Sequence, residues 1–165
     1  MRLIRSFTVV ALFAATAFVK SGPPWISIEY PGNPYDSVSR DAFLLVHAFH
    51  HGTPMAFPVS GTAEGLVQGA RRTISLEFKS TSRPGVYALR KQWPAEGVWT
   101  LVIAVTQGSG EGNTASAIVE LAPNGQVASV NVPTRRDRGW TLPASVAMSD
   151  VEAGLRARAG RLAAK

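Results

Sequence analysis

The sequence contains no cysteine among its 165 residues. This absence excludes a disulfide scaffold, a cysteine-ligated zinc or iron–sulfur site and a thiol nucleophile. Only 17% of the residues are charged and 45% are hydrophobic, so the chain is not a solvated disordered polymer. The length suits one sizeable core and is too short for two ordinary domains.

The motifs of several enzyme classes are also missing. There is no Gly-x-Ser-x-Gly elbow, and the glycine-rich stretch 108–113 is not followed by Gly-Lys-Ser/Thr. A serine–histidine–aspartate set from distant residues, such as Asp41, His47 and Ser60, stays open, because a triad is defined by geometry and not by spacing. We expect a noncatalytic protein.

Residues 1–21 have the pattern of a secretory signal. Two arginines open the chain, the stretch from Phe7 to Val19 carries no charge, and Ala15 and Ala17 have the spacing that a signal peptidase recognises. The uncharged stretch is shorter than the roughly 20 residues of a membrane-spanning helix. We therefore expect export to the periplasm or the exterior of a bacterial cell, with an uncleaved N-terminal anchor as the alternative to a cleaved signal.

Short segments in which apolar and polar residues alternate follow, separated by glycine and proline. Asn124-Gly125 lies between two such segments and predicts a hairpin with a type I′ turn. No helical pattern intervenes, although a short helix is an alternative for the apolar segment 43–49. Residues 22–132 are therefore predicted to form an all-β, antiparallel immunoglobulin-like β-sandwich of about seven to eight strands. The expected strands are 25–30, 43–49, 59–67, 71–79, 86–90, 98–106, 115–121 and 127–132.

The C-terminal region differs in charge from the rest. Residues 133–165 carry seven basic and three acidic residues, whereas the region between the signal and this segment is neutral. We expect a linker over 133–148 and a basic helical tail over 149–165, beginning at a capping box formed by Ser149 and Glu152. A neutral central region argues against nucleic-acid binding. The narrow apolar stripe of the tail favours a flexible, soluble tail or a helix docked on its own domain, with peripheral membrane or partner contact as the alternative.

A family resemblance rests on the middle of the chain, from Val59 to Gly108. The segment Arg71 to Lys79 is followed by Pro84-Gly85-Val86-Tyr87 and then by Gly97-Val98-Trp99-Thr100-Leu101-Val102. This order resembles small exported immunoglobulin-like domains of the YtkA-like type. The resemblance implies a fold and an envelope location, and it carries over no catalytic residue. Some relatives sit near copper-handling systems.

Four residues form a candidate metal site, His47, His50, His51 and Met55. Imidazole and thioether groups together suit copper. On a regular strand His47 and His50 point to opposite faces, so the set converges only if the strand breaks near Phe49. The alternative is a partly buried His47 followed by two polar loop histidines.

Trp93 precedes Pro94 in a predicted turn, and we expect it to be exposed as a contact residue. The leading hypothesis for function is a noncatalytic binding or accessory module of the bacterial cell envelope, which contacts another protein or a cell-surface polymer. The alternative is a periplasmic copper-handling protein that uses the histidine and methionine cluster.

Overall fold

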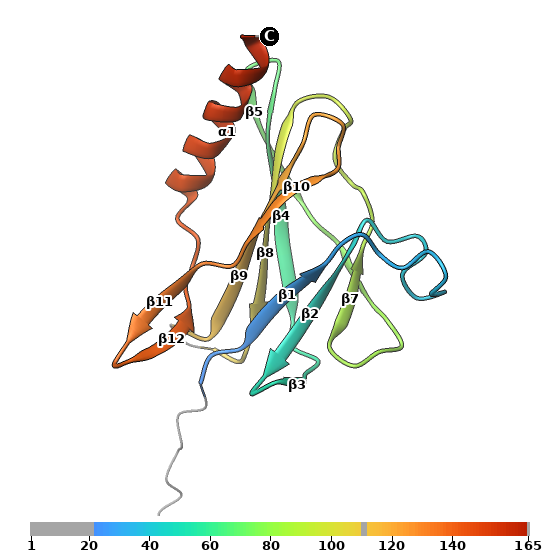
Figure 1. Cartoon of the computed structure of the whole chain (residues 1–165), viewed down its shortest axis with the longest axis vertical. Helices are drawn as coiled ribbons and strands as arrows, with labels where there is room; N and C mark the ends of the chain where they lie inside the picture. Colours follow the sequence, from blue (N-terminus) through green and yellow to red (C-terminus); the bar gives the residue numbers. More distant parts are fainter. Residues whose placement is uncertain (1–21, 110–111, 165) are drawn as a thin grey trace, which may run out of the picture.

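The computed structural model describes residues 22–109 and 112–164. The predicted signal segment, residues 1–21, lies outside the described residues. The described chain consists mostly of antiparallel β-sheet and ends in one short helix (Figure 1). The expectation of an all-β protein is confirmed at this level.

The first sheet has the strand order β1-β2-β7-β6, and the short strand β3 pairs with the far end of β2. Segment 43–49, for which a helix was the alternative, lies mainly in β2 and is central in this sheet. All of the pairings are antiparallel. The strands are β1 (Trp25–Glu29), β2 (Leu44–His50), β3 (Thr53–Pro54), β6 (Phe78–Ser80) and β7 (Val86–Leu89).

The second sheet has the order β10-β9-β8-β4-β5, again with antiparallel pairings. Its central strand β8 is the most apolar segment of the sheet and is covered on both faces, as its sequence predicts. The strands are β4 (Val59–Val67), β5 (Ala70–Ser75), β8 (Val98–Thr106), β9 (Thr114–Leu121) and β10 (Val127–Asn131).

One hydrophobic core is shared by the two sheets. Leu44 and Val46 of β2 and Leu101, Ile103 and Val105 of β8 are fully buried in it. Each set occupies alternate positions of its strand, because successive side chains point to opposite faces. Across this core β1 contacts β8 and β9. Both central strands thus direct alternate side chains into the shared core.

The segment predicted as one strand over 71–79 is divided between the sheets. β5 ends at Ser75 in the second sheet, and the chain then crosses to β6 in the first sheet. At the crossing Leu76 is buried, and its N–H donates to the carbonyl of Gly61 at 2.9 Å. The alternation continues through the break because both halves face the same core.

The hairpin predicted at Asn124-Gly125 is present between β9 and β10, but its turn is not type I′. Only Gly125 has a positive φ, of 79°, and its N–H donates to the carbonyl of Ala122 at 2.8 Å. The N–H of Ala122 donates in turn to Gln126. The loop thus contains three residues, because the negative φ required by Pro123 extends the turn by one position.

Residues 133–148 were predicted to be a linker, and they instead contain a two-stranded hairpin. It consists of β11 (Thr134–Asp137) and β12 (Trp140–Pro143). Its residues are exposed apart from Leu142 and Pro143. A hairpin that projects from the body has little apolar surface to bury, so its sequence lacks the alternation by which strands were recognised.

The helix α1 (Met148–Ala163) packs on the outer face of the second sheet. Val151 and Leu155 are buried there against Val98. The predicted capping box is wrong, because the N-cap residue is Ala147 and makes no side-chain cap hydrogen bond. Docking on its own domain is the observed arrangement of the tail. Within the described parts of the chain, no helix has the length and apolar character needed to cross a membrane.

Candidate functional site

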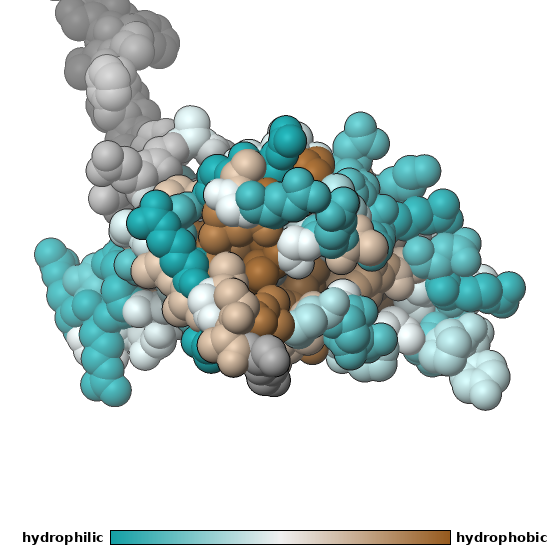
Figure 2. Space-filling model, turned by 90° about the horizontal axis from the view of Figure 1, so that it is seen from above, coloured by the Kyte–Doolittle hydropathy of each residue, from teal (hydrophilic) through white to brown (hydrophobic). Residues whose placement is uncertain are grey.

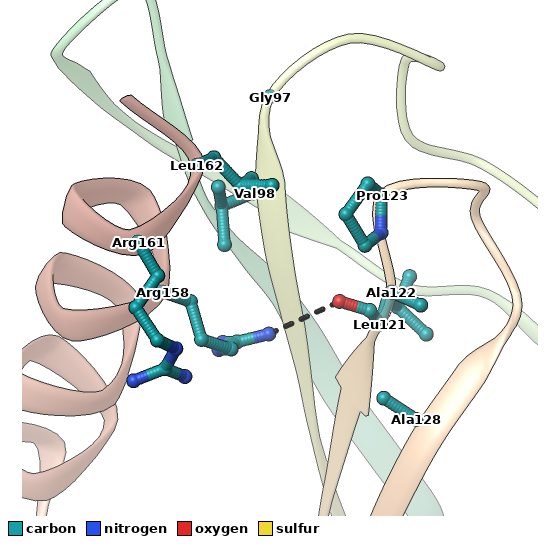
Figure 3. A pocket seen from close by; sticks show the side chains of 9 residues that line it. All are labelled: Gly97, Val98, Leu121, Ala122, Pro123, Ala128, Arg158, Arg161 and Leu162. Atoms are coloured by element: carbon teal, nitrogen blue, oxygen red, sulfur yellow. Dashed lines mark hydrogen bonds between the residues drawn. The ribbon is translucent and has the colours of Figure 1, made fainter. Parts of the chain in front are cut away.

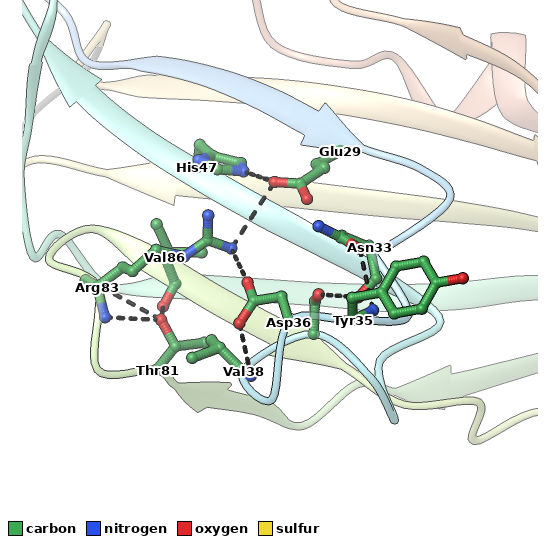
Figure 4. A network of polar contacts seen from close by, with 10 residues as sticks. Glu29, Asn33, Tyr35, Asp36, Val38, His47, Thr81, Arg83 and Val86 are labelled. Atoms are coloured by element: carbon green, nitrogen blue, oxygen red, sulfur yellow. Dashed lines mark hydrogen bonds and ion pairs between the residues drawn. The ribbon is translucent and has the colours of Figure 1, made fainter.

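His47 lies on the outer face of the first sheet, away from the other predicted ligands. Its Nε2 is 2.8 Å from the carboxylate of Glu29, which lies two residues beyond Ser27, the direct partner of His47 on β1. Arg83 Nη2 lies 3.8 Å from Glu29 and 3.7 Å from Asp36, so a chain of weak ion pairs follows (Figure 4). These last two distances exceed a normal hydrogen bond. His47 therefore belongs to a half-exposed ionic network.

His50 and His51 lie together at the turn between β2 and β3. Their ring centroids are 4.2 Å apart, and His51 takes a positive φ of 49°, which breaks the strand geometry. His50 Nε2 lies 3.1 Å from the carbonyl oxygen of Gly22. Met55, just after β3, is exposed. Two of the four predicted ligands are thus brought together.

No group of three or more histidine, cysteine or acidic side chains suited to a metal ion occurs in the described residues. This finding concerns only histidine, cysteine and acidic ligands, so it does not bear on a site that combines two histidines with the thioether of a methionine. The copper site of His47, His50, His51 and Met55 stays a prediction, now with His47 engaged by Glu29.

Trp93 is buried, with 5% of its surface exposed, and is not the exposed contact residue that its turn position suggested. Its ring packs edge-on against Phe43 at a centroid distance of 5.1 Å. The indole belongs to the core that the two sheets share. Burial of its apolar surface outweighs the loss of solvation of a turn residue.

A pocket of about 250 Å³ lies between the C-terminal half of α1 and the end of the second sheet. Figure 2 looks down on this end of the molecule and shows apolar side chains at the floor of a hollow with hydrophilic side chains around it. In Figure 3 the helix forms one wall, β8 the back, and β9 with its following turn the other wall. The lining includes Val98, Leu121, Pro123, Ala128, Arg161 and Leu162.

At this pocket Arg158 joins α1 to the ends of β8 and β9. Its Nη1 donates to the carbonyl oxygen of Leu121 at 3.3 Å (Figure 3). The same Nη1 donates to the carbonyl oxygen of Trp99 at 3.0 Å, and Nη2 donates to the hydroxyl of Thr100. The two carbonyls belong to the residues just beyond Thr100 and Glu120, the last pair of the β8–β9 ladder. Burial lowers the pKa of Arg158, and the carboxylate of Glu120 opposes this shift. The guanidinium thus supplies hydrogen-bond donors to carbonyl oxygens at the end of the β8–β9 ladder.

A polar row runs under α1 across three strands of the second sheet. Glu64, Thr100 and Glu120 are direct cross-strand neighbours on β4, β8 and β9. Glu64 is buried, accepts a hydrogen bond from Thr73 at 2.7 Å and pairs with Arg71 at 2.9 Å. Ala63, Leu101 and Val119, their neighbours in sequence, face the shared core, so these three polar side chains lie on the outer face of the sheet. The row contains two carboxylates, and each is paired with an arginine: Glu64 with Arg71, and Glu120 with Arg158.

Arg71 also links the row to α1. Its Nε donates to the carboxylate of Glu152 at 2.6 Å. Glu152 was expected to cap the helix and is used for this contact instead. Arg71 thus joins two carboxylates from different elements, Glu64 of β4 and Glu152 of α1.

Sequence reasoning missed the role of Arg158. One signal was present, because Val151, Leu155 and Arg158 are spaced by four and then three residues and so share one face of a helix. That face is the buried one. The carbonyls that Arg158 contacts come from strands far away in the sequence, and no local pattern indicates them.

Comparisons with family models, with curated proteins and with solved structures found no match to this chain. The site is therefore interpreted from its own geometry.

Proposed function

We propose that this chain is an exported immunoglobulin-like β-sandwich that acts as a noncatalytic binding module of the bacterial cell envelope. The export signal in residues 1–21 and the YtkA-like order of residues between Val59 and Gly108 support the location and the finer fold. The two antiparallel sheets over one shared core support the sandwich. The pocket beside α1 is proposed as the ligand site.

One observation carries the proposal, namely that the pocket combines an apolar floor with arginine at its edge. Val98, Leu121 and Leu162 supply apolar surface, and Arg161 supplies a cation that the described structure uses in no ion pair. Arg158 is occupied by carbonyl oxygens and adds its charge to the wall. Such a combination favours an apolar group that carries, or lies beside, an anion.

The size of the pocket indicates what kind of ligand it accepts. Its volume of about 250 Å³ is below the range of sites for whole drug-sized molecules. A single large side chain of a partner protein is the better match, because interface hot spots are single aromatic or aliphatic anchors seated in small pockets. The proposed partner is an envelope protein that presents an apolar side chain next to a carboxylate.

The test uses capped dipeptides as probes of the full chain. Phenylalanyl-aspartate is expected to shift the methyl resonances of Val98 and Leu162, and alanyl-aspartate and phenylalanyl-lysine are expected to shift them far less. Ala128→Phe places a ring in the pocket from an exposed position and is expected to abolish the shifts. Arg161→Gln is expected to remove the preference for aspartate over lysine.

Val130→Phe is the matched control, because it adds the same ring to an exposed position of β10 that does not line the pocket. It is expected to leave the shifts unchanged. Equal shifts from phenylalanyl-lysine, or shifts that persist in Ala128→Phe, would contradict the proposed site.

A further inference from the structure

The β11–β12 hairpin carries an exposed aromatic side chain away from the pocket. Trp140 is 74% exposed, whereas Trp93 and Trp99 are buried in the core. A tryptophan held in water loses the gain from burying its large apolar surface. An indole presented in this way on a projecting element marks a contact surface.

The same hairpin is positively charged. It carries Arg135, Arg136 and Arg138 against the single carboxylate of Asp137. Arg135 lies 3.5 Å from Asp137, and within the part of the chain that the structure describes neither Arg136 nor Arg138 forms an ion pair. Two arginines therefore remain to attract an anionic partner next to Trp140.

The backbone holds these groups in place. Arg138 and Gly139 have φ of 48° and 86°, and Asp137 is paired directly with Trp140, so the tip is a two-residue turn of the type that suits twisted hairpins. A preformed turn reduces the entropy lost when the hairpin binds. The hairpin therefore has its turn geometry already in the free protein.

The hairpin lies at the end of the molecule where the described chain begins (Figure 1). β1 starts and β3 lies at this end, and the first residue of β1, Trp25, and the residue after β3, Met55, are partly exposed, at 37% and 39%. The apolar stretch from Phe7 to Val19 precedes Gly22 in the sequence. The end that carries the hairpin is therefore the one joined in sequence to that apolar stretch.

We propose that the β11–β12 hairpin docks on an anionic phospholipid surface. Trp140 occupies the interface between headgroups and acyl chains, where tryptophan is enriched, and Arg136 and Arg138 contact lipid phosphates. This inference shares only the envelope location with the proposed function and does not involve the pocket. It also differs from membrane contact through the helical tail, because the apolar face of α1 is buried on the second sheet.

The test incorporates the full chain into vesicles of phosphatidylcholine, alone or with about a quarter of phosphatidylglycerol, and with brominated acyl chains as quenchers. Subtracting the emission of the Trp140→Phe variant isolates the signal of Trp140. Quenching of that signal is expected in the anionic vesicles and not in the neutral ones. Arg136→Gln with Arg138→Asn is expected to weaken docking about 25-fold, since each basic residue near the surface contributes about fivefold.

Arg40→Gln with Arg72→Gln is the matched control, because it removes the same charge from exposed positions outside the hairpin. It is expected to leave quenching unchanged. Ala128→Phe, which fills the pocket, is also expected to leave quenching unchanged, so the pocket and the hairpin are tested separately. Near-ultraviolet circular dichroism from Trp93 and Trp99 verifies that each variant is folded. The proposal is overturned if quenching is equal in both kinds of vesicle, if the hairpin variant retains it, or if the hairpin binds an anionic polysaccharide and no vesicle.

Discussion

The outer faces of the two sheets both carry charged rows, but they are covered to different degrees. On the first sheet the side chains of His47, Glu29 and Arg83 are 19%, 33% and 41% exposed. On the second sheet α1 lies over the row, and the side chains of Glu64 and Arg158 are only 4% and 11% exposed. Similar residue types are thus placed in two different dielectric surroundings.

The difference teaches that a covering helix changes what a charge contributes to stability. Exposed ion pairs are screened by water and add little. Buried groups have already lost their hydration, so removal of one partner leaves the other without compensation. We therefore expect the second sheet to be sensitive to single substitutions that the first sheet tolerates.

The largest effect is expected for Arg158→Met. The substitution leaves the carbonyls of Trp99 and Leu121 and the hydroxyl of Thr100 without this donor under the helix. We expect the free energy of unfolding to fall by about 3 kcal/mol, measured by urea denaturation.

Arg156→Met is the control, because Arg156 is on the same helix with its side chain 74% exposed. Its loss is expected to cost less than about 0.5 kcal/mol. Equal losses in the two variants would mean that the contacts of Arg158 contribute nothing beyond an exposed charge.

A smaller effect is expected for Glu64→Gln. The amide keeps the shape of the side chain and an oxygen that accepts the hydrogen bond from Thr73, but it loses the charge that pairs with Arg71. Arg71 retains Glu152, so the expected loss in unfolding free energy is about 2 kcal/mol. Glu77→Gln, at an exposed position, provides the comparison. A similar loss of unfolding free energy in both variants would show that the burial of Glu64 adds nothing to its contribution.

The smallest effect is expected on the first sheet. A double-mutant cycle of Glu29→Gln and His47→Gln measures the coupling between these side chains, which lie 2.8 Å apart and are partly exposed. We expect less than about 1 kcal/mol at neutral pH, because water screens the pair. A coupling as large as the loss in Arg158→Met would show that exposure does not separate the two faces.

Part of the candidate site could be predicted from sequence. The apolar wall residues Val98 and Leu121 lie in strands that alternation identified, and the basic helix was recognised as a unit. The site itself was not predicted, because it exists only where α1 meets the ends of β8 and β9. Trp93 was misplaced for a related reason, since a turn residue is buried or exposed according to where the turn folds.

The sequence by itself determined the β character of the chain, most of its strands and the presence of a terminal helix. These follow from the period of apolar residues and from glycine and proline, which act over a few neighbours. Only the tertiary structure decided where segment 71–79 crosses between sheets, that residues 134–143 form a hairpin, and that Arg158 closes the end of a ladder. Each of these depends on partners distant in the chain, which a local pattern does not contain.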